Sequence, residues 1–201
     1  TTGATVVPDV EKLSRCVLFW RSLMHWIGGM GVLVFMLAIL PLKGGNTVHL
    51  LRAESSGPSV SKIMPKVQTS ASILYLIYIG LTALEAVLLK LGGMTLFDSL
   101  NYAMSTAATG GFGVYNEGIG VYNSDFINIV VTVFMFLFGL NFNVYFLLLA
   151  GKPKEILKKS EIKVYFLLIF ISILTIGFFV REYYDNIKDC VVNTAFTVGA
   201  F

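Results

Sequence analysis

Charged residues are scarce in this chain. Asp, Glu, Lys and Arg together make up 13% of its 201 residues, whereas hydrophobic residues make up 56%. Ordinary soluble domains carry about 25% charged residues. The mean hydropathy of +0.77 agrees with this imbalance. The composition therefore indicates a membrane protein.

Residues that bind metals or perform chemistry are scarce as well. The chain has two histidines and two cysteines, Cys16 and Cys190, and none stands at metal-ligand spacing, so we expect free thiols and no transition-metal site. It has no H-E-x-x-H or G-x-S-x-G motif and no paired carboxylates within its apolar runs. The glycine-rich stretch GGFGVYNEGIG lacks the Lys-Ser/Thr of a phosphate-binding loop. These absences predict that the protein is not an enzyme and has no organic cofactor.

The apolar residues that are present form blocks long enough to cross a bilayer. A hydrocarbon layer of about 30 Å needs about 20 helical residues. We expect four membrane-spanning helices, at residues 18–42, 69–92, 126–150 and 163–181.

Lys and Arg are concentrated in two connections between these blocks. Residues 43–68 contain four of them against one Glu, and residues 151–163 contain five Lys against two Glu. The positive-inside rule therefore predicts that both connections face the cytoplasm. Residues 91–124 contain no Lys or Arg, and alternation of the spans places them outside. Because these loops account for the net charge of +3, the charge gives no argument for binding nucleic acid.

The outer connection contains a short apolar helix followed by a glycine turn. In MTLFDSLNYAMSTAATGGFG, residues 94–113, apolar positions recur at helical spacing and Asp98 is the predicted N-cap. A helix of about ten residues is too short to cross a membrane, which indicates a re-entrant segment. The chain then turns at residues 109–111 and returns to the same side.

Non-helical backbone at membrane depth needs partners for its carbonyl groups, and a cation can be that partner. Glycine lets successive carbonyls turn toward one axis through dihedral angles that a Cβ disfavours. We expect such a positive φ at Gly110, which would let the carbonyls of Ala108 and Thr109 face an ion. The C-terminal end of the short helix adds partial negative charge at the same place. The Thr-Gly turn therefore has the character of a piece of an ion-selectivity filter.

The same pattern recurs along the chain. Thr2-Gly3 is followed by a polar stretch and the first span, and Thr109-Gly110 is followed by a polar stretch and the third span. The stretch CVVNTAFTVGAF at residues 190–201 has the character of another short pore helix. We expect the end of one repeat at residues 1–42, a whole repeat at 69–150 and the start of a third at 163–201. Cytoplasmic linkers at 43–68 and 151–162 join them. The chain is then a piece of a longer protein.

Four stretches of the chain resemble the potassium-uptake subunits of the Trk/Ktr/HKT superfamily, and most of all its TrkH branch. They are LFWRSLMHWIGGMGVLVFMLAILP, the E-x-x-G-P motif beginning at Glu54, FDSLNYAMSTAATGGF and GLNFNVYFLLLAGK. The resemblance covers essentially the whole chain. It implies an all-α membrane protein in which four M1-P-M2 units (helix, re-entrant pore helix with filter loop, helix) build a pseudo-fourfold pore.

The resemblance also implies a site and partners. The first filter strand would be Thr1, Thr2, Gly3 and Ala4, and the second Ala108, Thr109, Gly110 and Gly111. Relatives move K⁺ inward across the plasma (inner) membrane, assemble as homodimers and bind a cytosolic nucleotide-binding subunit of the RCK type. The alternative left open by the residues is a carrier of another solute with a midplane site, which would show interrupted spans. In this sequence the apolar runs predict uninterrupted spans.

Polar residues within the spans have two interpretations each. For Glu85 we favour a structural role, packed against a polar neighbour or reaching toward Lys90 at the surface, over a place in the ion pathway. For Arg21 we favour anchoring at the outer interface over an ion-repelling charge. His25 is expected to be a hydrogen-bonded packing residue, because no ligand partner stands at metal spacing.

Small and amide residues in the spans are open to similar alternatives. Gly28, Gly29 and Gly31 suit either close helix packing, which we favour, or a hinge. Asn141 and Asn143 suit either interhelical hydrogen bonds, again favoured, or one side chain facing the cavity.

Overall fold

The computed structural model describes residues 7–31, 67–141, 143–149, 151, 159–184 and 186–200. Helices and turns account for all regular structure in these ranges, so the predicted all-α class is confirmed. The α-helices are α1 (Arg15–Met30), α4 (Val67–Leu91), α5 (Leu96–Thr106), α6 (Asp125–Gly139), α7 (Asn143–Leu149), α9 (Ser160–Val180) and α10 (Ile187–Ala200). Short 3-10 helices lie at η1 (Val10–Lys12), η3 (Gly118–Tyr122) and η4 (Arg181–Tyr183).

Two of the four expected spans are helices long and apolar enough to cross a membrane. They are residues 72–91 of α4 and residues 160–183, which comprise α9 and η4. In the first expected span, α1 ends at Met30, where Gly31 adopts a φ of 83°. Residues 32–42 of that span lie outside the described ranges. Two of the four predicted spans are therefore present as whole helices in the described residues.

The third expected span, residues 126–150, is interrupted, so the prediction of one whole helix is wrong. α6 ends at Gly139, and Leu140 is extended, with φ −70° and ψ 145°. The amide N–H of Leu140 and the hydroxyl of Tyr145 donate to the Leu137 carbonyl at 3.2 and 2.6 Å. These bonds give the Leu137 carbonyl partners at the break. The hydrogen bonding of α6 can therefore end within an apolar run. α7 then continues for seven residues.

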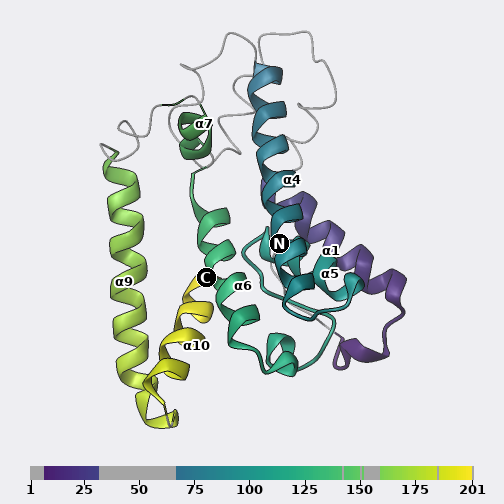
Figure 1. Ribbon diagram of the computed structural model, residues 1–201, viewed down its shortest axis with the longest axis vertical. Helices are drawn as coiled ribbons and strands as arrows, with labels where there is room; N and C mark the ends of the chain where they lie inside the picture. Colours follow the sequence, from purple (N-terminus) through teal and green to yellow (C-terminus); the bar gives the residue numbers. More distant parts are fainter. Residues whose placement is uncertain are drawn as a thin grey trace.

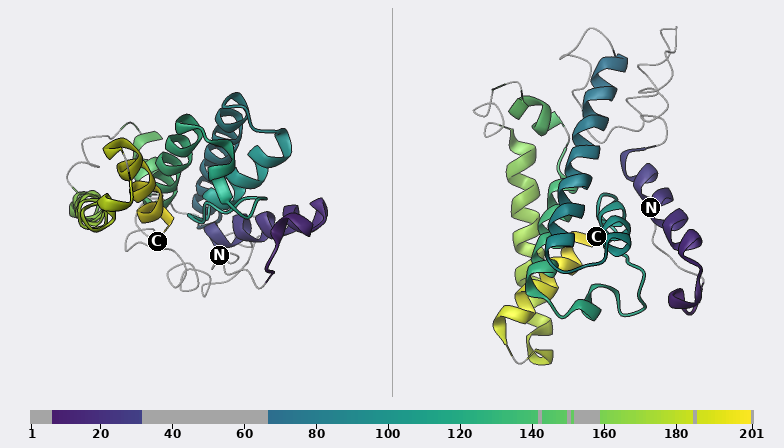
Figure 2. Two further views of the ribbon diagram at one scale, coloured as in Figure 1. Left: turned by 90° about the horizontal axis from the view of Figure 1, so that it is seen from below. Right: turned by 45° about the vertical axis from the view of Figure 1, so that its right-hand side comes forward.

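The two short apolar helices occupy similar places between longer helices (Figure 1). α5 packs against α4, which precedes it, and against α1; α10 packs against α9, which precedes it, and against α6. Figure 2 shows the same order, with α1 at one edge and α9 at the other. α4 and α9 begin at one end of the molecule, and the loops after them lie at the other end.

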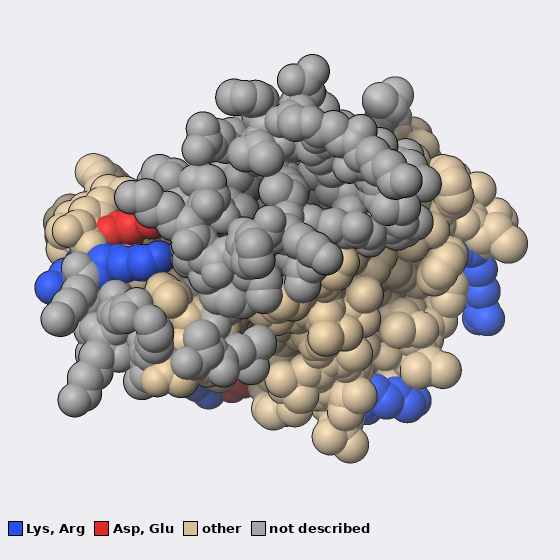
Figure 3. Space-filling model, turned by 90° about the horizontal axis from the view of Figure 1, so that it is seen from above, with Lys and Arg blue, Asp and Glu red and all other residues tan. Residues whose placement is uncertain are grey.

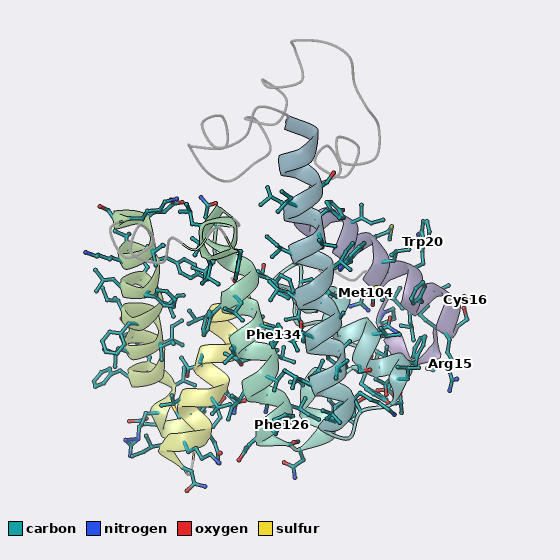
Figure 4. All side chains as sticks on the ribbon, turned by 45° about the horizontal axis from the view of Figure 1, so that its top comes forward. Arg15, Cys16, Trp20, Met104, Phe126 and Phe134 are labelled. Carbon is teal, nitrogen blue, oxygen red and sulfur yellow. The ribbon has the colours of Figure 1, made fainter. Side chains whose placement is uncertain are left out.

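The main hydrophobic core joins α4, α5 and α6. It comprises Tyr78, Leu89, Met94, Tyr102, Ala107, Ile119, Ile127, Val130, Val131, Phe134, Met135 and Phe138. Phe134 lies between α6 and α4 (Figure 4). α5 is the most enclosed helix of the group, because every residue from Asn101 to Thr106 is buried.

The outer surface is apolar where helices face away from this core. α9 has no buried residue, and its Phe178 and Phe179 are 80% and 73% exposed. On α1, Trp20 and Cys16 point away from the rest of the molecule (Figure 4). Seen from the end where α4 begins, charged side chains of the described residues lie at the periphery (Figure 3). Such a surface suits lipid or further protein rather than water. Both cysteines are free, as predicted.

Candidate functional site

The short helix α5 begins at a cap that differs from the prediction. Thr95, not Asp98, is the N-cap, and its hydroxyl oxygen accepts from the Asp98 amide N–H at 3.2 Å. The Asp98 carboxylate lies one turn in and accepts from the hydroxyls of Thr95 and Tyr122 at 2.7 and 2.8 Å. Burial, followed by the hydrogen bond to Asp98, raises the pKa of Tyr122, so this phenol stays a donor. Asp98 therefore ties the start of α5 to η3.

The end of α5 is organised by Ser105. Its carbonyl accepts from the amide N–H groups of Ala108 and Gly110 at 3.1 and 3.0 Å. Its hydroxyl oxygen accepts from the amide N–H of Phe112 at 2.9 Å. One residue thus holds both sides of the turn. Ser105 was not among the predicted site residues, although a Ser in the last turn of a helix before a Thr-Gly step suits such side-chain-to-backbone bonding.

The backbone strain in the turn falls on residues other than the predicted one. Thr109 and Gly111 adopt left-handed φ values of 56° and 61°. Gly110 does not, so its predicted need for a positive φ is wrong. A Cβ on Gly110 would instead crowd the Phe112 ring at 2.9 Å and the Ser105 carbonyl oxygen at 3.3 Å. Left-handed dihedral angles at alternate residues allow successive carbonyls to turn to one side.

Several carbonyls of the turn have few or no hydrogen-bond donors among the described residues. The Ala108 carbonyl accepts from the Thr109 hydroxyl at 2.7 Å and from no other described group. Within those residues no hydrogen bond reaches the carbonyl oxygens of Thr109, Gly110 or Gly111. Buried backbone carbonyls in proteins normally have a partner. The turn therefore offers a set of oxygen atoms suited to a desolvated monovalent cation.

Three helices enclose this turn. A Cβ on Gly29 of α1 would lie 2.9 Å from the Ala108 Cα and 3.0 Å from the Ala107 carbonyl oxygen. A Cβ on Gly111 would overlap the methyl of Met135 of α6 and lie 2.9 Å from the Phe196 ring of α10. The close approach at Gly29 agrees with the favoured packing interpretation of the glycines in α1. The turn is thus fixed from α1, α6 and α10 together.

Arg21 and His25 both lie against Phe112, the residue that follows the turn. The Arg21 guanidinium carbon is 6.0 Å from the centre of the Phe112 ring, and the His25 ring meets that ring edge-on at 5.9 Å. Arg21 is therefore turned toward the turn segment rather than simply anchored at the interface. His25 packs as expected, but the expected hydrogen bond is missing at Nδ1, which has no partner among the described residues.

Glu85 and Asn141 are also placed by the structure. Glu85 is completely buried, so the interpretation in which it reaches toward the surface is wrong, and Thr106 of α5 is the polar group beside it. Asn141 lies in the break between α6 and α7 and donates to the Glu161 carboxylate at 3.1 Å, a contact between two segments as expected. The side chain of Asn143 is outside the described set.

Other predicted site residues cannot be placed. Thr1, Thr2, Gly3 and Ala4 lie outside the described ranges, as do most of the two basic linkers. Among the described residues, no three His, Cys, Asp or Glu side chains come together as a metal site. The backbone of residues 108–111 instead presents carbonyl oxygens that have few or no hydrogen-bond donors among the described residues.

The sequence profile of the TrkH family, described as a cation transport protein, matches residues 1–180. The chain belongs to the TrkH family. The TrkH potassium uptake proteins of Vibrio parahaemolyticus and Salmonella typhimurium are 38% and 37% identical to it, over 87% and 78% of the chain. The TrkG potassium uptake protein of Escherichia coli is 34% identical over 89% of the chain. The matches cover 36%, 32% and 37% of these relatives, so the chain spans about a third of their length.

A solved structure supports the same fold. The crystal structure of the potassium transporter TrkH from Vibrio parahaemolyticus superposes with a TM-score of 0.78 and 29% sequence identity, over 99% of this chain and 40% of that one. The family assignment makes this TrkH-family chain a membrane protein related to transporters rather than to enzymes.

Proposed function

We propose that this TrkH-family chain is part of a subunit that moves K⁺ inward across the plasma membrane through a carbonyl-lined filter. The observation that carries the proposal is the turn at residues 108–111, where the carbonyls of Thr109, Gly110 and Gly111 have no hydrogen-bond donor among the described residues. Carbonyl oxygens of this kind replace the hydration shell of K⁺. The C-terminal end of α5 directs its partial negative charge to the same place.

The packing of the short helices supports a repeated unit. Each lies between the long helix that precedes it and a helix of the unit before: α5 between α4 and α1, α10 between α9 and α6. We assign α4, α5 and α6–α7 to one M1-P-M2 unit, α9 and α10 to the start of the next, and α1 to the end of the previous one. Residues 1–4 would supply the filter strand of that previous unit, beside residues 108–111.

The basic linkers give this pore its orientation. Positive charge at residues 43–68 and 151–163 favours a cytoplasmic position, with the filter turn toward the outside. The exposed apolar face of α9 requires lipid or protein cover. A homodimer in the bilayer and a cytosolic RCK-type subunit docked on the basic linkers complete the proposed assembly. Cysteine labelling of intact cells tests it: Lys158→Cys should be protected from outside and Glu117→Cys should react.

The interruption after Gly139 is the one feature that favours the alternative, a carrier with a midplane site. Two carbonyls beside it are already occupied, however. Leu137 accepts from Tyr145 and Leu140, and Phe136 accepts from the Tyr165 hydroxyl at 3.0 Å. These bonds leave fewer carbonyl oxygens near the break to bind a solute.

Gly111→Ala in the full-length protein is the experiment that tests the filter. The new Cβ adds left-handed strain of about 1 kcal/mol and meets Met135 and Phe196. Because a difference of about 1.4 kcal/mol between two ions changes their preference tenfold, we expect about a tenfold loss of K⁺-over-Na⁺ preference. Uptake of both ions into cells lacking other K⁺ transport measures it.

Gly118→Ala is the matched control, since Gly118 has a similar φ of 63° and no atom near its Cβ position. It should retain the preference. Gly110→Ser should also reduce the preference, by displacing Phe112 rather than by backbone strain. Unchanged K⁺ affinity and preference in Gly111→Ala and Gly110→Ser, at normal membrane levels, would show that residues 108–111 are not a filter strand.

A further inference from the structure

One buried face of α4 contacts α1, which is one of the helices around the filter turn, and α5, which leads into the turn. Tyr78, Thr82 and Glu85 lie on this face at intervals of four and three residues and are 0%, 9% and 0% exposed. Tyr78 donates its hydroxyl to the Trp26 carbonyl of α1 at 2.7 Å, and Thr82 accepts from the Trp26 indole N–H at 3.1 Å. The third residue, Glu85, faces α5.

Glu85 has no conventional partner for a carboxylate. Both of its side-chain oxygens are buried and accept no hydrogen bond from any described residue. No described Lys, Arg or His forms an ion pair with it. An ionised carboxylate in such a place is very unfavourable, and buried groups of this kind become neutral instead.

The neighbouring hydroxyl supports a neutral side chain. Thr106 lies beside Glu85, and its single hydroxyl hydrogen is already donated to the Tyr102 carbonyl at 2.8 Å. A carboxylate can only accept, so it has nothing to bind on Thr106. A carboxylic acid has an O–H to donate, and the Thr106 hydroxyl oxygen still has a lone pair to receive it.

Thr106 is also the residue that leads into the filter turn. It is the last residue of α5, and its carbonyl accepts from the Thr109 amide N–H at 2.7 Å. Thr109 is the first left-handed residue of the turn. A displacement of Thr106 toward or away from α4 is therefore passed directly to the residues whose carbonyls face the ion.

We propose that Glu85 is a protonated carboxylic acid that donates to the Thr106 hydroxyl, holds the end of α5 against α4 and so sets the position of the filter carbonyls. It is a positioning residue for ion selection and does not contact the ion. The proposal rests on the assignment of residues 108–111 as a filter strand.

The test compares three replacements in the full-length protein reconstituted in lipid vesicles. Glu85→Gln keeps the size and a donor group, whereas Glu85→Leu keeps the size approximately and removes the donor. We expect Glu85→Gln to stay within about twofold of the original K⁺-over-Na⁺ preference and Glu85→Leu to lose about tenfold. Thr106→Val should match Glu85→Leu, and the double variant should be no worse than either single one.

Thr132→Val is the control for loss of a buried hydroxyl. Thr132 on α6 is 6% exposed and donates to the Asn128 carbonyl at 2.7 Å. It should keep the preference. If Glu85→Gln lost the preference as fully as Glu85→Leu, a charged role in the ion pathway would replace the proposal. Additive losses in the double variant would also overturn it.

Infrared spectroscopy separates this proposal from the filter assignment. The purified protein at neutral pH should show the carbonyl band of a protonated carboxylic acid, and Glu85→Gln should lose it. Absence of that band would show an ionised Glu85 and overturn the proposal even if Gly111→Ala confirmed the filter. If the band were present but Gly111→Ala left selectivity unchanged, the filter assignment would fail, and with it the role of Glu85 in selection.

Discussion

The two short helices α5 and α10 have similar surroundings but very different burial. Both follow a long apolar helix, and both begin with a polar residue three positions before an Asp: Thr95 before Asp98, and Asn186 before Asp189. Yet α5 is buried along most of its length, whereas only Cys190 and Thr194 are buried in α10. α5 contacts α1, α4 and α6; α10 contacts α6 and α9.

The difference shows what encloses a short helix in this fold. Two neighbouring helices, α6 and α9, are enough to position α10. A third neighbour, α1, buries α5 from the other side of the turn. α9 has Ile176 ten residues before Asn186, where α4 has Glu85 ten residues before Thr95. The buried acid therefore belongs to the more enclosed unit and is not a general feature of both.

The largest effect is expected at the contact between α1 and α5. Gly29→Ala places a Cβ 2.6 Å from the Tyr78 hydroxyl and about as close to the backbone of Ala107 and Ala108, atoms that cannot rotate away. We expect a loss of stability of about 3 kcal/mol together with lower K⁺ affinity, since overpacking of this kind costs about 1–3 kcal/mol. Thermal unfolding in detergent and K⁺ uptake measure the two effects.

Gly199→Ala is the matching change in the contact between α10 and α6. Its Cβ would lie 3.2 Å from Cβ and the sulfur of Met135, contacts that a shift of a few tenths of an ångström relieves. We expect this variant to lose less than about 1 kcal/mol of stability. An equal loss in both variants would mean that α5 and α10 are packed equally tightly.

The next effect is expected at the start of the two helices. Asp98→Ala removes the buried acceptor of the Tyr122 and Thr95 hydroxyls. This change should reduce the free energy of unfolding by about 2 kcal/mol. Asp189→Ala removes only an exposed contact with Asn186 and should cost about 0.5 kcal/mol or less. Hydrogen exchange of amides in α5 and α10 distinguishes them, and faster exchange in α10 alone would contradict the ranking.

Sequence reasoning was most successful where one physical signal dominates. Length and apolarity predicted α4 and α9 to within three residues, because a bilayer imposes both on a spanning helix. The turn after α5 followed from Thr109, Gly110 and Gly111. The assignment of residues 108–111 as a filter strand stays a prediction.

The errors arise where side-chain contacts decide the outcome. The break at Leu140 lies in an apolar run that hydropathy cannot distinguish from a helix, and it depends on the Tyr145 hydroxyl. The left-handed residues proved to be Thr109 and Gly111 because Ser105 determines how the turn closes. Burial of Glu85 depends on α5 covering it, which no local pattern in α4 reveals.

The smallest effect is expected at the outer ties between neighbouring units. Asn116 joins the segment after α5 to η1: its side chain donates to Asp9 at 2.9 Å and accepts from the Val10 amide N–H at 2.9 Å. The counterpart next to α10 is the ion pair of Lys188 with Asp125. Both ties are largely exposed, and exposed pairs contribute little.

Asn116→Ala tests the first tie through the titration of Asp9. The hydrogen bond from Asn116, followed by that from Lys12, holds the pKa of Asp9 below its ordinary value of 3.8. The tie therefore stabilises the fold above that pH and is lost as the pH falls through the lowered pKa.

In Asn116→Ala the pKa of Asp9 should rise toward 3.8 and the Val10 amide should exchange faster at neutral pH. Lys12→Met, the control, should raise the same pKa less and leave Val10 protected. NMR titration of labelled Asp and hydrogen exchange measure both, and a larger shift in Lys12→Met than in Asn116→Ala would show that the tie depends on charge rather than on the amide.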